Sequence, residues 1–164
     1  MIKVPIVLAR IDARLVHGVV VTNWNAELNP KRFMIVDNEI SQNEALKATM
    51  RMAKPSGTGM SIINTEKAIA NFKNGNYDDQ RVFLLVKDPR TIIELIDAGV
   101  EVPKVDVGII FMDTGRTKVS SYVAMGPDDR DALQEIQKRN IPVVLQYVPN
   151  DPEEAIEKYF DKIK

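Results

Sequence analysis

Six short and almost continuously apolar runs recur along the chain, and they constrain the fold more than any other feature of the sequence. These runs are IVLARI (6–11), FMIVD (33–37), MSIIN (60–64), VFLLV (82–86), VDVGII (105–110) and PVVLQY (142–147). Runs without polar alternation are typical of strands covered on both faces. Because longer segments with helical periodicity separate them, we predict an α/β fold with an open, mainly parallel sheet and helices on both faces.

Three dipeptides predict where helices begin, since each places a capping residue before a proline at the first helical position. They are Asp88-Pro89, Gly126-Pro127 and Asp151-Pro152. The helix from Pro89 is expected to end at Gly99, and the helix from Pro127 near Arg139-Asn140.

The composition fits one globular unit. The chain has 164 residues, of which 45% are hydrophobic and 27% charged, and no repeat, low-complexity tract or linker divides it. We therefore expect a single domain over residues 1–164. The absence of cysteine excludes disulfides, thiolate zinc sites and a cysteine nucleophile, and it fits a reducing compartment.

The charge balance narrows the possible partners. The formal net charge is −1, so no overall field would attract nucleic acid or an anionic membrane. The N-terminus lacks the pattern of a signal peptide, and no window contains the roughly eighteen apolar residues that a membrane span needs. We expect a soluble, cytoplasmic protein, which leaves open docking onto a membrane protein.

The stretch RIDARLVHG, residues 10–18, contains the only histidine of the chain, His17. The first predicted strand ends near Ile11, and the next helix is predicted to begin near His17, so the segment forms the first strand-to-helix loop. In open α/β sheets, ligands bind at loops of this kind. A helix N-terminus also presents unpaired N–H groups and the positive end of its dipole, which together favour an anion.

The residue types in this loop suit phosphoryl chemistry. An uncharged imidazole such as that of His17 is nucleophilic near neutral pH, and Arg10 and Arg14 can neutralise and orient a phosphoryl group. Gly18 allows close approach of the backbone. Asp12 either fixes the imidazole tautomer or holds one of the arginines. The alternative is that this segment only binds phosphate or a phosphoprotein without reacting, or that its charges are merely structural.

The same stretch resembles the phosphorylation-site motif of the IIB components of mannose/fructose/sorbose-type sugar phosphotransferase systems, R-I-D-D/N-R-L-I/V-H-G-Q-V. The matching residues are Arg10, Ile11, Asp12, Arg14, Leu15, Val16, His17, Gly18 and Val20. The similarity extends over nearly the whole chain, through regions of the second, fourth and fifth strands. It implies one IIB domain with an open, mainly parallel sheet.

The resemblance also implies a relay. His17 would accept a phosphoryl group at Nδ1 from a phosphohistidine on a IIA component and pass it to a sugar carried by IIC and IID membrane components. Arg10 and Arg14, with N–H groups around Gly18, would stabilise the phosphoryl oxygens. The implied activity is that of a protein-histidine sugar phosphotransferase in the bacterial cytoplasm, associated peripherally with its membrane permease and needing neither cofactor nor metal.

The sequence departs from the family pattern at several positions. Ala13, Val19, Ile109-Ile110 and Arg116 stand where the family more often has Asp or Asn, Gln, Gly-Met and Lys. These departures bear on the choice of partner and sugar, and mannose, N-acetylgalactosamine or a related sugar is the expectation. The oligomeric state stays open.

Other polar clusters receive structural interpretations. Asp37-Asn38-Glu39 suggests a magnesium site or a phosphoacceptor aspartate, but solvated loop carboxylates are favoured because receiver-like chemistry needs acids from several loops and a nearby lysine. Ser56 to Gly59 lacks the P-loop pattern and is predicted to form a turn. Asp113 to Thr117 is expected to form a loop near the site, and Trp24 is expected to pack in the core.

Overall fold

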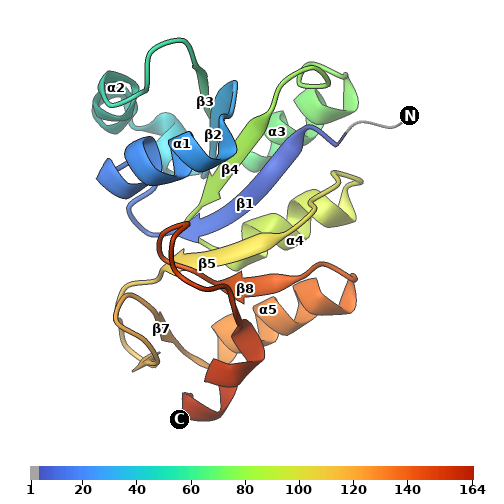
Figure 1. The fold of residues 1–164 in the computed structure, drawn as a ribbon. Helices are drawn as coiled ribbons and strands as arrows, with labels where there is room; N and C mark the ends of the chain where they lie inside the picture. Colours follow the sequence, from blue (N-terminus) through green and yellow to red (C-terminus); the bar gives the residue numbers. More distant parts are fainter. Residues whose placement is uncertain (1–3) are drawn as a thin grey trace.

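A seven-stranded sheet organises the chain, and it is seen in a computed structural model that describes residues 4–164 (Figure 1). In the order β3-β2-β4-β1-β5-β8-β9, every neighbouring pair is parallel except β8 and β9. The strands are β1 (Ile6–Asp12), β2 (Arg32–Val36), β3 (Gly59–Ile63), β4 (Val82–Val86), β5 (Val105–Ile109), β8 (Val143–Leu145) and β9 (Glu154–Ala155). Each of the six apolar runs overlaps one parallel strand, which confirms the predicted sheet.

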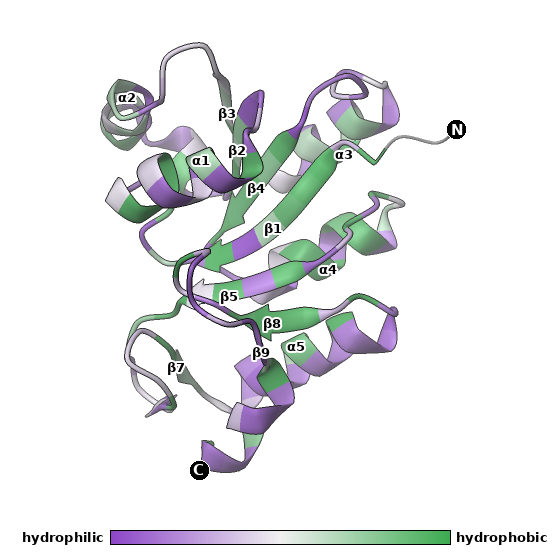
Figure 2. Cartoon of the chain, viewed as in Figure 1, coloured by the Kyte–Doolittle hydropathy of each residue, from purple (hydrophilic) through white to green (hydrophobic). Residues whose placement is uncertain are grey.

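Helices cover both faces of this sheet, as the sequence predicts (Figure 1). One face carries a helical stretch over residues 18–28, formed mainly by the π-helical η1 (Val20–Trp24) and by α1 (Asn25–Leu28), together with α2 (Glu44–Met52). The other face carries α3 (Thr65–Lys73), α4 (Pro89–Asp97) and α5 (Pro127–Lys138). Figure 2 shows mostly apolar strands in the interior and a mixture of hydrophobic and hydrophilic colours on the helices.

Two apolar clusters form the core, one on each side of the sheet. On the side of α1, Trp24 lies 6.5 Å from Phe83 between ring centroids, and Phe83 lies 5.8 Å from Phe33. Trp24 is 3% exposed, so the prediction that it packs is confirmed. The larger cluster lies against α3, α4 and α5 and includes Leu95 and Leu133, both completely buried.

Two of the three predicted helix starts are confirmed. α4 begins at Pro89, where the Asp88 side chain accepts a hydrogen bond from the Arg90 amide at 2.9 Å, and α5 begins at Pro127. The prediction at Asp151-Pro152 is wrong, because β9 and the 3₁₀ helix η3 (Ile156–Lys162) follow there. The side-chain amide of Gln146 donates hydrogen bonds to the carbonyls of Pro149 (3.2 Å) and Asp151 (2.8 Å). Residues 154 and 155 then pair with β8.

A small antiparallel ribbon lies beyond β5. It consists of β6 (Thr117–Lys118) and β7 (Ala124–Met125), and Ile110 forms a bridge to Val123 at its base. Residues 113–116 form the loop that leads into this ribbon, as expected from the sequence. Between β2 and α2 lies one short 3₁₀ turn, η2 (Ile40–Gln42). Within residues 4–164, none of the helices combines the length and the apolarity that spanning a membrane would require.

Candidate functional site

The loop after β1 is a tight turn built on Asp12, the last residue of that strand. The Asp12 carboxylate accepts a hydrogen bond from the Arg14 amide at 2.8 Å, and its carbonyl accepts one from the Leu15 amide at 3.1 Å. Leu15 has a φ of 55°, a left-handed conformation that costs a leucine about 1–2 kcal/mol. Its side chain is 3% exposed and packs against the core on the α1 side, which holds the turn in place.

His17 follows this turn at the entrance of the helix, where its carbonyl accepts the first helical hydrogen bond from the Val21 amide at 2.9 Å. Its side chain is 15% exposed, and Nε2 lies 2.8 Å from Oδ2 of Asp12. Burial raises the pKa of Asp12, but the hydrogen bond from His17 and the charge of Arg10 outweigh it and hold that pKa below its usual value. Ionised Asp12 accepts a hydrogen bond from Nε2–H, which leaves the free lone pair of the imidazole on Nδ1.

Arg10 shares the Asp12 carboxylate with His17 and is completely buried. Its Nε donates to Asp12 at 3.0 Å, while Nη1 donates to Asp106 at 2.6 Å and to the carbonyl of Gln146 at 3.0 Å. The guanidinium also lies 5.1 Å from the centroid of the Trp24 ring. Figure 2 shows the result as hydrophilic bands within the otherwise apolar β1 and β5.

Gly108 makes room for this buried arginine. A Cβ atom on Gly108 would lie 2.2 Å from Cζ of Arg10, which is far inside van der Waals contact. Asp106, two residues earlier on β5, is buried, and burial raises its pKa to about 7 despite the charge of Arg10. One guanidinium therefore lies between two buried carboxylates whose pKa values are shifted in opposite directions.

Sequence reasoning missed Asp106, Gly108 and Gln146. The available signal was an aspartate and a glycine inside the apolar run VDVGII, together with an arginine inside IVLARI. Charged residues in doubly covered strands must find partners of opposite charge, so the two runs could have been expected to be neighbours.

Arg14 and Gly18 lie at the surface of the same site. The Arg14 side chain is exposed, its Cζ lies 5.9 Å from the centroid of the Phe111 ring, and no carboxylate within residues 4–164 pairs with it. Gly18 is the first helical residue, and an added Cβ would meet no atom within 4 Å. The structure thus groups Asp12, His17 and Arg10 in one hydrogen-bonded chain and leaves Arg14 free to contact a ligand.

The other polar clusters have structural roles. Asp37 accepts hydrogen bonds from the amides of Glu39 (3.0 Å) and Ile40 (2.9 Å), and Asn38 accepts one from the amide of Thr65 at 2.9 Å. In the part of the chain that the structure describes, no group of three potential metal ligands comes together. Residues 56 and 57 form the predicted turn before β3.

The fold and this loop define a small α/β protein with a carboxylate-oriented histidine at the carboxyl edge of a parallel sheet. Residues 6–164 match the family described as PTS system sorbose subfamily IIB component, and the chain belongs to this family.

Relatives in this family resemble the chain in sequence, and one solved structure also resembles it in fold. The sorbose-specific EIIB component of Lacticaseibacillus casei is 33% identical over 96% of this chain and 96% of that protein. The mannose-specific EIIAB component of Escherichia coli K12 is 31% identical over 95% of this chain and 48% of that protein. The crystal structure of the IIBSor domain of the sorbose permease from Klebsiella pneumoniae superposes with a TM-score of 0.92 at 30% identity, over 97% of this chain and 98% of that one.

Proposed function

We propose that this chain is a IIB subunit that carries a phosphoryl group on Nδ1 of His17, between a IIA component and a sugar held by IIC and IID membrane components. Membership of the family supports the transferase class. The observation that carries the assignment to His17 is the 2.8 Å contact between Nε2 and Asp12, because it directs the free lone pair of the imidazole to Nδ1.

The reaction has two phosphoryl transfers. In the first, the Nδ1 lone pair attacks the phosphorus of the donor phosphohistidine, so that a new N–P bond forms while the donor's N–P bond breaks. In the second, a sugar hydroxyl attacks the same phosphorus, loses its proton to solvent or a base, and returns the lone pair to Nδ1. Phosphorylation of Nδ1 makes the ring cationic, and ionised Asp12 stabilises that charge through the Nε2 proton.

The two arginines have different roles in this proposal. Arg14 is exposed and unpaired, so it can contact the phosphoryl oxygens, with the first amides of the helix near Gly18 assisting. The sequence pattern suggests the same direct contact for Arg10. Because Arg10 is completely buried and bonded to Asp12, its environment favours a positioning role exerted through that carboxylate.

The same proposal covers the setting of the reaction. Residues 1–164 would act as one phosphocarrier domain in the bacterial cytoplasm, meeting a IIA donor and the IIC and IID components of a permease. The name EIIAB of the E. coli relative supports a IIA partner. Relatives named for sorbose, mannose, fructose and N-acetylgalactosamine support a sugar of that group as the final acceptor.

Intact-mass measurement tests the phosphocarrier role. The protein is incubated with a IIA component and the upstream relay proteins that phosphorylate it from phosphoenolpyruvate. We expect the mass of one phosphoryl group to be gained, to be lost in acid, and to be absent in His17→Ala. If the IIA component becomes phosphorylated and the wild-type chain gains no mass, the site is a noncatalytic phosphate-binding site and the proposal fails.

A further inference from the structure

Three large apolar side chains are exposed together beside the His17 loop. Phe111 is 50% exposed, Met112 64% and Tyr122 49%. Phe111 and Met112 follow β5, and Tyr122 lies between β6 and β7 of the small ribbon. The Ala13 amide donates to the carbonyl of Ile109 at 2.9 Å, which ties this segment to the site. Exposed apolar side chains that gather in one place are typical of an interaction surface.

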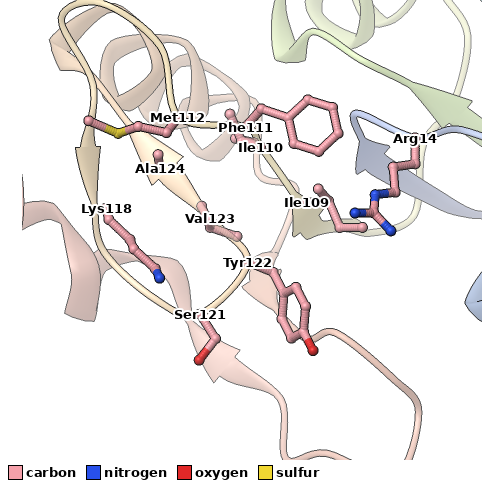
Figure 3. A pocket seen from close by; sticks show the side chains of 10 residues that line it. All are labelled: Arg14, Ile109, Ile110, Phe111, Met112, Lys118, Ser121, Tyr122, Val123 and Ala124. Atoms are coloured by element: carbon pink, nitrogen blue, oxygen red, sulfur yellow. The ribbon is translucent and has the colours of Figure 1, made fainter.

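A groove of about 270 Å³ lies next to these side chains (Figure 3). Arg14 and Lys118 line it, and Figure 3 shows them at opposite ends with the rings of Phe111 and Tyr122 between. Every other lining residue is apolar except Ser121, and none is acidic. The groove is therefore apolar in the middle and positively charged at its ends.

A second hollow, of about 550 Å³, adjoins this groove, and Phe111 and Met112 line both. Its remaining lining is acidic on balance, with carboxylates from Asp37, Glu39, Asp88, Glu94 and Asp113 and two cations, Lys87 and Arg116. Phe111 and Met112 thus form a ridge between a cationic groove and an acidic hollow. A partner with complementary charges would be held in one orientation on such a surface.

We infer that this ridge and the cationic groove are the docking surface for the phosphorylated IIA donor, an inference that rests on the proposed function. The occupant is an apolar segment of the IIA surface flanked by carboxylates, which face Arg14 and Lys118, with basic side chains over the acidic hollow. Arg14 belongs to both the groove and the His17 loop, so docking here brings the donor's phosphohistidine to Nδ1. A sugar would find few hydrogen-bonding groups in this groove.

Transfer kinetics test the inference through Phe111→Ser, Met112→Ser and Lys118→Glu. The initial rate of His17 phosphorylation is measured by rapid quenching and intact mass against the concentration of phosphorylated IIA. We expect the half-saturating concentration to rise about tenfold in each variant. The rate at saturation is expected to be unchanged in Met112→Ser and Lys118→Glu, because these two substitutions affect docking and not chemistry. Met52→Ser and Lys73→Glu, which alter exposed side chains outside both hollows, are the matched controls.

Calorimetric titration with unphosphorylated IIA measures docking separately from chemistry. A wild-type chain that binds IIA through the ridge but gains no phosphoryl group contradicts the proposed function while supporting the docking surface. If the IIA affinity and the half-saturating concentration are unchanged in Phe111→Ser and Lys118→Glu, the docking surface is overturned. The inference also fails if IIA phosphorylates these variants normally but the variants phosphorylate sugar slowly with membranes containing IIC and IID, since the groove would then bind the membrane acceptor.

Discussion

Arg10 lies in β1 and Arg14 in the turn that follows this strand, yet Arg10 is completely buried and Arg14 is exposed. We predict that Arg14→Ala slows phosphoryl transfer about 10²–10³-fold, because it removes a charged donor from the transition state. Rapid-quench measurement at saturating IIA checks this, and the thermal unfolding midpoint is expected to stay unchanged. Transfer at the wild-type rate would remove Arg14 from the mechanism.

Asp106 gives the site a pH dependence of stability. Its pKa is raised to about 7 in the folded protein from an ordinary value of 3.8, so the folded state holds this proton more tightly than the unfolded state. The resulting stability is fully present below about pH 4 and is lost as the pH rises through about 7. In Asp106→Asn we expect this decline to disappear, which changes the pH dependence of the unfolding free energy by a few kcal/mol.

Denaturant titrations of both proteins at pH 5 and pH 8 measure this difference. Asp97→Asn is a suitable control, since Asp97 is an exposed carboxylate paired with Arg139 and has a lowered pKa. A wild-type protein whose unfolding free energy varies with pH in the same way as that of Asp106→Asn would contradict the assignment.

At the scale of elements, β1 and β5 are joined by the Arg10 side chain as well as by backbone hydrogen bonds. We predict that Gly108→Ala destabilises the protein by about 1–3 kcal/mol, because the new methyl group displaces the Arg10 guanidinium. Gly18→Ala is the matched control, since open space surrounds Gly18 and alanine favours helix more than glycine does. Equal unfolding free energies for the two variants would show that Arg10 moves aside without loss.

The elements themselves were largely predictable from sequence. Apolar runs locate the parallel strands because burial on both faces leaves little room for polar residues. Asp88-Pro89 and Gly126-Pro127 locate helix starts because those signals are local. Asp151-Pro152 carries the same signal but is overridden by Gln146, whose amide holds the carbonyls of that segment.

The site was predictable only in part. The loop position of His17 follows from the strand and helix patterns, and its contact with Asp12 is local. The burial of Arg10 could not be predicted in the same way. Its partner Asp106 lies 96 positions away, and their contact depends on β1 and β5 being neighbours in the sheet. The exposed ridge at Phe111 and Met112 was not predicted either, since it lies just beyond the apolar run VDVGII.

At the scale of the whole molecule, the C-terminal segment completes the core. Ile156 of η3 is completely buried in the cluster on the α4 and α5 side, whereas Trp24 lies in the cluster on the opposite face. We predict that Ile156→Ala lowers the unfolding free energy by about 2–5 kcal/mol. The unfolding transitions followed by Trp24 fluorescence and by far-UV circular dichroism are expected to move to the same new midpoint. Leu46→Ala, at a 43% exposed position, is the control.

Separate midpoints for the two signals would mean that the faces of the sheet unfold independently. Coincident midpoints would show one cooperative unit, as expected when both clusters share the same strands.

The close packing of the Arg10 guanidinium against Gly108 also limits how this protein can be recombined with its relatives. A chimera with its crossover between β1 and β5 takes Arg10 from one parent and the residue at position 108 from the other. If the second parent has any side chain at position 108, that side chain displaces the guanidinium in the hybrid, however well each parent protein folds. Crossovers that keep both strands from one parent preserve the site, so the two positions are inherited as a pair.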